Sequence, residues 1–443
     1  MIHIGKPYME AEGQTVRLLT PLDIDGEKKE IFVSVEQRYK DFLSADRGDA
    51  ILIGILRYAM LHRHDIVSDI PISEELFYKV TGILLPTLKK SDKRVYACHI
   101  ECETAPQKAS GAGVGTGNSC GVDSFYTILK HRNTPLKKQN LTHLAIYNAG
   151  SFNGIYRSYG IKAVRDSVWK RSEAAAKELG LPLIKVDSNI HEVLSISHLT
   201  SHTYLDMFMV YSLQNLWSKY YYSGGADYSS FDLSGNLHSD PAHFELLLLN
   251  CFSTKSIELI LAGAECNRTD KVSFIADNEV AQKYLHVCTS SAENCGVCEK
   301  CRRTLLAIDA VGRLEKFQQT FPIEEYKHHR EDQYRFLCEK HFLNDVPYRD
   351  SYEKSFSLLY PHHKNEFDRY LKEANPRFVY SKLRNMEKRL EAMREQFNIL
   401  DYVSDKTKVR SHLLNTLENL DIRAVAFYGD SLIMRYLLDL IKK

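Results

Sequence analysis

The sequence predicts an α/β protein built on a doubly wound parallel sheet, and three observations lead to this fold class. Between residues 113 and 312, short apolar segments alternate with longer helix-compatible ones, as in βα units. A run of small residues separates the first strand from the first helix, and four cysteines lie near the end of the same region. We therefore expect an N-terminal α+β extension (residues 1–112), a central α/β domain (113–312) and a mainly helical C-terminal domain (313–443).

The composition is that of a globular chain with several domains. Its 443 residues are 44% hydrophobic, which is enough for full cores. The 58 Lys and Arg residues balance 57 Asp and Glu residues, which disfavours nucleic acid as a partner. No secretory signal opens the sequence, and no apolar run is long enough to cross a bilayer. Ten cysteines without such a signal indicate a reducing compartment, so we expect a soluble cytoplasmic protein without membrane contact.

The first 112 residues read as a small α+β unit. Residues 16–19 and 31–35 alternate like strands, and Asp25-Gly26 between them predicts a hairpin turn. Residues 49–64 are apolar on most faces, which predicts a buried helix. These elements carry no recognisable chemistry, so we expect either an accessory domain or an elaborated edge of the central sheet.

The most informative stretch is the loop of residues 117–124, Gly-Asn-Ser-Cys-Gly-Val-Asp-Ser, which an apolar, helix-compatible segment follows. Such a strand–loop–helix junction leaves backbone N–H groups unpaired at a helix N-terminus, where the dipole favours phosphate. Ser119 and Ser124 add hydroxyl donors, and Asp123 could hold Mg²⁺ or order the loop. No Walker A or dinucleotide glycine pattern is present. A capped Gly/Ser loop without a ligand is the alternative for this stretch alone.

Further βα units follow the loop. Residues 141–147, 181–186 and 220–223 read as strands, and residues 162–179 and 202–217 as helices. Ligands bind at the carboxyl ends of the strands in open α/β sheets. We therefore expect substrate contacts in residues 148–157 and 223–227.

Four cysteines form the second strong signal: Cys288, Cys295, Cys298 and Cys301. Their spacing lets a knuckle and the first turn of a helix surround one tetrahedral ion, and Gly296 relieves the turn. Four sulfur ligands with no open position predict a structural zinc site. An iron–sulfur cluster and four unligated thiols are the alternatives.

From residue 313 onward, charged residues interleave with aromatic ones at helical spacing, as in residues 326–338 and 380–397. This pattern predicts the helical C-terminal domain. The adjacent histidines at 328–329 and 362–363 point apart on a helix, so we do not expect them to bind metal. Residues 425–440 read as one more strand–turn–helix.

The loop resembles the Ser-Gly-Gly-x-Asp-Ser signature of the PP-loop ATP pyrophosphatases. Its residues are Ser119, Cys120, Gly121, Val122, Asp123 and Ser124, with Cys120 in the place of a glycine. The segment 294–303, Asn-Cys-Gly-Val-Cys-Glu-Lys-Cys-Arg-Arg, resembles the Cys-Gly-x-Cys-x-x-Cys-x-x-Arg segment of 7-cyano-7-deazaguanine synthases. Thr269 and Lys271 lie upstream, as does the Thr-Lys pair of that family, but here one residue separates them. The similarity covers roughly residues 113 to 312.

The resemblance implies a ligase that activates a carboxylic acid with ATP and Mg²⁺, and a zinc ion on the four cysteines. In the family enzyme the acid is 7-carboxy-7-deazaguanine, which gives an acyl adenylate and pyrophosphate. An amine then displaces AMP to leave an amide. Diverged relatives occur in bacterial antiviral gene clusters, so the amine can be ammonia or a protein or peptide amine.

The resemblance also assigns roles to residues. Residues 119–124 and Arg268 would bind the nucleotide, and Asp123, Ser124 and Lys271 would be catalytic. Lys271 and Arg268 would neutralise phosphate charge from across the site. A solvated surface lysine is the alternative for Lys271. Aromatic side chains could stack on a purine-like ring; we considered Phe152, Tyr156 and Tyr221.

Some alternatives stay open on the sequence. Cys120 is tolerated if its backbone φ is below zero, whereas a thiol at a helix N-terminus with a lowered pKa would be a nucleophile. A PP-loop tRNA-modifying enzyme and a non-catalytic binding module that keeps the fold are the competing functions. A homodimer is one candidate assembly.

Overall fold

The computed structural model describes residues 1–109, 111–151, 161–234, 240–342 and 349–373. The chain divides into two compact units, Met1–Gln333 with Asp345–His363, and Tyr334–Asn344 with Lys364–Lys443. The first is a mixed α/β unit and carries every site discussed below. Phe152, Tyr156, the expected helix over 380–397 and the expected strand–turn–helix over 425–440 lie outside the described residues. Among the helices that are described, none has the length and apolarity to cross a membrane.

One large, mostly parallel sheet of eleven strands organises the described part of the first unit. The strands are β1 (Ile2–Ile4), β2 (Tyr8–Glu12), β3 (Thr15–Ile24), β4 (Glu27–Glu36), β5 (Ile66–Ser73), β6 (Ile100–Ala105), β7 (Gly113–Gly117), β8 (His143–Asn148), β9 (Leu183–Ser188), β10 (Trp217–Ser223) and β11 (Glu258–Ala262). Their order across the sheet is β11-β10-β7-β8-β9-β4-β3-β1-β5-β6, and β2 pairs with β3.

Strands β7 to β11 make the parallel half of the sheet, as the alternating pattern predicts. Each neighbouring pair from β11 through β10, β7 and β8 to β9 is parallel. Within this half of the sheet, β7 is the first strand along the chain. β8 and β9 follow on one side of β7, and β10 and β11 then lie on its other side. The loops after β7 and β10 therefore lead away from a topological switch point, which is where open α/β sheets bind ligands.

The N-terminal strands extend this sheet. β3 and β4 form the expected hairpin, and its turn residues Asp25 and Gly26 both have positive φ, as a type I′ turn requires. β4 then pairs antiparallel with β9, so hydrogen bonding continues from residues 1–112 into the central strands. The compact unit accordingly runs past the boundary expected near residue 112. Residues 1–112 therefore extend the edge of the central sheet rather than form a separate accessory domain.

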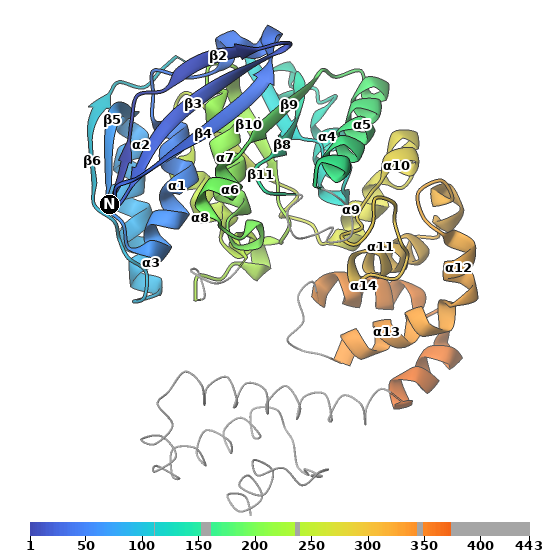
Figure 1. Cartoon of the computed structure of the whole chain (residues 1–443). Helices are drawn as coiled ribbons and strands as arrows, with labels where there is room; N and C mark the ends of the chain where they lie inside the picture. The colour runs from blue at the N-terminus through green and yellow to red at the C-terminus, as the bar shows by residue number, and fades with distance from the viewer. Residues whose placement is uncertain (110, 152–160, 235–239, 343–348, 374–443) are drawn as a thin grey trace, which may run out of the picture. The chain divides into compact units, whose positions relative to one another are not determined.

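Helices pack on both faces of the sheet (Figure 1). The helices of the described residues, in chain order, are α1 (Asp49–His62), α2 (Glu74–Lys79), α3 (Leu85–Ser91), α4 (Val122–His131), α5 (Ile161–Leu179), α6 (Ile190–Leu194), α7 (His202–Ser212), α8 (Glu245–Phe252), α9 (Arg268–Ile275), α10 (Glu279–Tyr284), α11 (Glu299–Ala310), α12 (Ile323–His328), α13 (Arg330–Phe342) and α14 (Arg349–Leu359). A π-helical segment, Val80–Leu84, joins α2 to α3.

Alternate residues of β10 show that each face has its own core. Tyr220 and Tyr222 belong to the core that contains α1, α7 and α8, whereas Tyr221 belongs to the core that contains α4, α9 and α11. Successive side chains of a strand point to opposite faces, so this alternation is the expected signature of a sheet buried on both sides.

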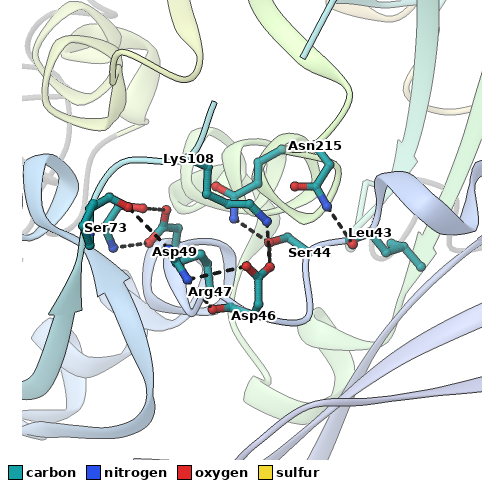
Figure 2. Close-up of polar contacts among 10 residues, drawn as sticks. Leu43, Ser44, Asp46, Arg47, Asp49, Ser73, Lys108 and Asn215 are labelled. Atoms are coloured by element: carbon teal, nitrogen blue, oxygen red, sulfur yellow. Dashed lines mark hydrogen bonds and ion pairs between the residues drawn. The ribbon is translucent and has the colours of Figure 1, made fainter. Parts of the chain in front are cut away.

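Polar contacts anchor the segment before α1 to the rest of the unit (Figure 2). The buried Asp49 carboxylate accepts hydrogen bonds from the backbone N–H of Ser73, at 2.8 Å, and from its hydroxyl, at 2.5 Å. Asp46 accepts from the ammonium of Lys108 at 2.7 Å, and Asn215 donates to the carbonyl of Leu43 at 3.1 Å. These bonds tie the start of α1 to β5 and to the segment that enters β10.

The described part of the C-terminal region, residues 313–342 and 349–373, is mainly helical, as expected. α14 packs against α9, where the backbone N–H of Arg268 donates to the Ser351 hydroxyl at 2.9 Å. The Thr269 hydroxyl donates to the Ser351 carbonyl at 2.9 Å. α12 and α14 thus belong to the first compact unit, and the division of the chain does not follow the boundary expected at residue 312.

Candidate functional site

The loop between β7 and α4 closes on itself through Ser124. The Ser124 hydroxyl donates to the carbonyl of Gly117 at 2.7 Å and accepts from the backbone N–H of Ser119 at 3.1 Å. The Ser119 hydroxyl in turn accepts from the backbone N–H of Gly121 at 3.3 Å. Gly121 is the N-cap of α4, so the helix presents its first N–H groups at this loop without intrahelical acceptors. The two serines therefore hold the loop in shape.

Cys120 departs from both expectations made for it. Its φ is +58°, in the left-handed region where glycine is favoured, rather than below zero. The side chain is fully buried, with its Sγ 3.8 Å from Asn118 Oδ1 and 3.9 Å from Ser172 Oγ. Burial raises the pKa of the thiol to about 12. Desolvation thus outweighs the helix N-terminus, which disfavours the interpretation of Cys120 as a reactive thiolate.

Asp123, Arg268 and Lys271 converge beside the loop. We call these three residues the loop cluster. Lys271 Nζ lies 2.8 Å from Asp123 Oδ1, and Arg268 Nη2 lies 3.0 Å from Asp123 Oδ2. Both cations come from α9, where Asn267 caps the helix by accepting from the backbone N–H of Asp270. Residues about 145 positions apart along the sequence therefore meet at the first turn of α4.

The charges of the loop cluster compensate one another. Burial would raise the pKa of Asp123, but the charges of Lys271 and Arg268 outweigh it and hold the pKa at about 2. Lys271 is only 2% exposed, and its Nζ also donates to the carbonyl of Gly224 at 2.8 Å. It is therefore an internal lysine, and the surface alternative is wrong. Gly224 directly follows β10, so the cluster joins the loops that leave both strands of the switch point.

Two further cations lie near the loop cluster. Arg303, on α11, is buried, and its charge contributes to the low pKa of Asp123. Lys300 is on the first turn of the same helix, close enough to Arg268, Arg303 and Asp123 for their charges to interact. These residues lie in the segment that resembles the synthase, but their position beside the loop was not foreseen.

The four cysteines form one cluster that could hold a metal ion. Their sulfur atoms all lie within 4.8 Å of one another. Cys288 Sγ is 3.9 Å from Cys298 Sγ, and Cys295 Sγ is 4.0 Å from Cys301 Sγ. α11 begins directly after Cys298 and carries Cys301 on its first turn, as the spacing predicts. Among the described residues, no other group of ligand side chains meets this geometry, and the paired histidines contribute none.

Backbone and amide hydrogen bonds position the cysteines. Gly296 takes a φ of +74°, which lets the chain turn between Cys295 and Cys298. The backbone N–H of Cys298 points at Cys295 Sγ from 3.3 Å. Asn294 accepts from the backbone N–H groups of Val287 and Cys288 at 2.9 and 3.2 Å. These hydrogen bonds, and not disulfide bonds, therefore hold the knuckle in shape.

Tyr221 does not fit the stacking role considered for it. Its ring is buried and stacks on the ring of His131, with centroids 3.8 Å apart. Its hydroxyl donates to the side chain of Gln139 at 3.0 Å. Tyr221 lies in the core beside α4, so it is a packing residue rather than a surface for a ligand.

Comparisons of the chain with protein-family models, with curated proteins and with solved structures found no match.

Proposed function

We propose that this chain is an enzyme that adenylates a carboxylic acid with ATP, releases pyrophosphate and passes the acyl group to an amine. The acid would be 7-carboxy-7-deazaguanine or a related deazapurine acid, and the amine would be ammonia or a protein or peptide amine. One observation carries the proposal: the partly buried Arg268 and the buried Lys271 meet Asp123 at the N-terminus of α4, beside the switch point of a parallel sheet.

The charge of the loop cluster supports phosphate binding. Two cations share one carboxylate, so the cluster has a net charge of about +1 before the N-terminus of α4 adds its dipole. Leaving pyrophosphate carries negative charge that must be held in place during reaction. Cations and N–H groups held in position before the nucleotide arrives would supply that stabilisation without reorganising.

The partners of Asp123 favour one of its two proposed roles. Both carboxylate oxygens already accept from cations, one from Lys271 and one from Arg268. We infer that Asp123 holds these cations in register and that Mg²⁺ binds chiefly to phosphate oxygens and water, as is usual for this ion. Residues 119–124 would contact the phosphates through backbone N–H groups, with Ser119 and Ser124 shaping the loop.

We further propose that the cysteine cluster holds a structural zinc ion. A tetrahedral ion with Zn–S bonds of about 2.3 Å gives sulfur–sulfur distances of about 3.8 Å. The distances of 3.9 and 4.0 Å between paired sulfurs are close to this value. The ion would fix the start of α11, which carries Lys300 and Arg303 toward the loop cluster. Its role in the reaction would therefore be to position cations.

The arrangement of strands supports a doubly wound, PP-loop type of fold for the central part of the chain. The order β9-β8-β7-β10-β11, numbered along the chain, is that of the mononucleotide-binding α/β folds, 3-2-1-4-5. In such a fold the first strand leads into the phosphate loop, as β7 does here.

The test is product analysis. The full-length protein is incubated with Mg-ATP and carboxylic acids, beginning with 7-carboxy-7-deazaguanine, and the nucleotides are identified by mass. We expect AMP and pyrophosphate, and we expect Lys271→Met to slow their formation roughly 10²-fold or more. Lys283→Met is the matched control, because Lys283 is an exposed lysine that pairs with Glu178 on a different helix. ADP with phosphate, or no turnover with any acid, would refute the proposal.

A second experiment identifies the acceptor. Proteins co-expressed with the enzyme are analysed by mass spectrometry for an added deazaguanine acyl group. An adduct on an amine supports a protein or peptide acceptor. A free amide or nitrile of the acid, formed with ammonia alone, supports ammonia.

A further inference from the structure

A second cluster of titratable side chains lies at the same end of β10 as the loop cluster. We call it the carboxyl cluster: His202, Asp206, Tyr222, Asp240 and Glu245. His202 and Glu245 are the first residues of α7 and α8. These helices, like α4, start at the carboxyl ends of the parallel strands, so their first turns lie at one edge of the sheet.

Hydrogen bonds link four members of the carboxyl cluster into a chain. His202 Nε2 lies 2.7 Å from Asp240 Oδ1, and His202 Nδ1 lies 3.1 Å from the Tyr222 hydroxyl. The Tyr222 hydroxyl lies 3.5 Å from Asp206 Oδ2. Tyr222 comes two residues before Gly224, the carbonyl that accepts from Lys271. The two clusters therefore meet through the end of one strand.

Glu245 is the fifth member of the carboxyl cluster, and in the described part of the chain one of its carboxyl oxygens lacks a hydrogen-bond donor. Its side chain is 2% exposed, and its Oε2 has no hydrogen-bond partner among the described residues. The Glu245 carboxyl interacts electrostatically with four charged residues: His202, Asp240, Asp123 and Lys271. A buried carboxyl oxygen without a donor costs on the order of 1 to 3 kcal/mol, so the site favours a ligand or a water that donates a hydrogen bond.

The carboxyl cluster contains three carboxyl groups, and His202 is its one member that can carry positive charge. Asp240 forms an ion pair with His202 and interacts electrostatically with His243. The charge of Lys300 also interacts with Asp240. Asp206 and Glu245 receive much less compensation. Burial raises the pKa of Asp206 to about 6 and that of Glu245 to about 8, and the charge of His202 offsets this only in part. A bound cation with N–H donors would supply what both carboxyls lack.

We propose that the carboxyl cluster binds the acceptor amine in its ammonium form and that Asp206 takes a proton from it. This inference rests on the proposed function and assigns the second half of that reaction to Asp206, Glu245 and their supports, His202 and Asp240. A metal ion does not suit the cluster, since its carboxylate and imidazole atoms do not converge as metal ligands.

In the proposed transfer step, Asp206 acts as the base and AMP is the leaving group. One N–H proton of the ammonium passes to the Asp206 carboxylate, and the freed nitrogen lone pair attacks the acyl carbon of the acyl adenylate. A C–N bond forms, the C–O bond to AMP breaks, and AMP leaves with the bonding electrons. The second N–H proton passes to water, leaving a neutral amide. His202 and Asp240 are positioning residues in this step, because both ring nitrogens of His202 are already engaged.

The first test separates the two halves of the reaction. Acid-dependent exchange of pyrophosphate into ATP measures adenylation, and amide formation measures transfer. For Asp206→Asn we expect exchange within about twofold of wild type but transfer to methylamine roughly 10²-fold slower. Hydroxylamine is largely neutral at neutral pH and needs no base, so its transfer rate should be nearly restored. Asp232→Asn, an exposed aspartate with its own serine partner, is the matched control and should change neither rate.

Two outcomes of this test would overturn the inference. One is unchanged transfer to methylamine in Asp206→Asn. The other is a raised KM for the acid in the exchange reaction, which would mean that the cluster binds the ring of the acid rather than the amine.

The second test needs no activity, and so it distinguishes failure of this inference from failure of the proposed function. Thermal unfolding is followed with methylammonium chloride and with tetramethylammonium chloride at equal ionic strength. We expect a saturable rise in Tm with the first salt only, because the second has no N–H donors. Asp206→Asn and Glu245→Gln should each lose the difference, and Asp232→Asn should keep it. Equal responses of the wild-type protein to both salts, or a difference that survives in both variants, would overturn the inference.

Discussion

The loop cluster and the carboxyl cluster, which share the end of β10, treat buried charge in opposite ways. Asp123 has two cationic partners, and its pKa is held at about 2 in spite of burial. Glu245 is buried without such partners, and its pKa rises to about 8. Burial alone therefore does not decide the ionisation of a carboxyl in this protein. The number of cations that the fold brings to the carboxyl decides it.

This contrast suggests different tasks for the two clusters. A compensated cluster keeps its geometry in the absence of a ligand, which suits the holding of phosphates during reaction. An uncompensated cluster gains most when a ligand supplies the missing charge, so it should respond to cations and to pH. Four experiments test whether the two clusters differ in this way.

The largest effect should follow from loss of the proposed zinc ion, which would release the start of α11 beside the loop cluster. Cys298→Ser removes one ligand from the start of α11, and structural zinc contributes on the order of 10 kcal/mol to folding. We expect the variant to lose bound metal and to unfold at a much lower temperature, and chelation of the wild-type protein should do the same. Metal analysis and thermal unfolding measure both. Cys102→Ser, outside the cysteine cluster, is the control and should retain its metal; a Cys298→Ser protein of wild-type stability would contradict a structural ion.

The next largest effect should come from breaking the compensation at Asp123. Asp123→Ala leaves Lys271 buried without its carboxylate, and removal of one partner from such a pair costs about 3 to 5 kcal/mol. Urea unfolding measures this loss. Asp277→Ala breaks an exposed ion pair with Arg313 and should cost at most about 1 kcal/mol. Equal effects of the two substitutions would show that the loop cluster is no more tightly coupled than the surface.

The third prediction concerns the carboxyl cluster and pH. The folded-state pKa of Glu245, about 8, lies above its ordinary value of 4.5, so the folded state holds the proton more tightly than the unfolded state. Its contribution to stability is therefore full below about pH 4.5 and is lost as the pH rises toward about 8, by up to about 1.4 kcal/mol per pH unit. Glu245→Gln should remove this slope.

The measurement is the free energy of unfolding of both proteins between about pH 5 and about pH 7.5, over which the difference should grow to about 3 kcal/mol. Glu293→Gln, an exposed glutamate, is the control and should follow the wild-type curve. Parallel curves for wild type and Glu245→Gln would mean that Glu245 ionises normally, and the contrast with Asp123 would disappear.

The smallest effect should be at Cys120. Because its thiol is buried and its pKa is raised, Cys120→Ala should keep ATP-dependent turnover within about twofold and lower stability by about 1 kcal/mol. Thiol reagents should label Cys120 in the native protein far more slowly than in the unfolded protein. Loss of turnover in Cys120→Ala would restore the nucleophile interpretation.

Features that depend on near neighbours in the chain could be predicted well. The Asp25-Gly26 turn, the loop before α4 and the knuckle of four cysteines each lie within a short stretch, and the structure contains all three. Turn chemistry, helix starts and ligand spacing are local properties, which explains their agreement. Arg268 and Lys271 were predicted beside the loop only through the resemblance, since no periodicity links them to Asp123.

Cys120 marks the limit of such local reasoning. The pattern identified the residue as an exception, but φ and burial decided its chemistry. Whether a thiol at a helix N-terminus is a thiolate depends on its burial, and Ser172 of α5, distant in sequence, lies 3.9 Å from the sulfur. Burial raises the pKa of the thiol, although the hydrogen bond with Ser172 lowers it in part.

The amino-acid pattern alone predicted the parallel α/β core, the loop before α4 and the four-cysteine cluster, because each depends on residue spacing and side-chain type. Only the tertiary structure joined β4 to β9 and so made the N-terminal strands part of the same sheet. It alone brought together His202, Asp206, Asp240 and Glu245, which come from separate elements without a shared motif. The physical reason is that pairing of strands and compensation of buried charge depend on contacts between distant segments, and these exist only once the chain has folded.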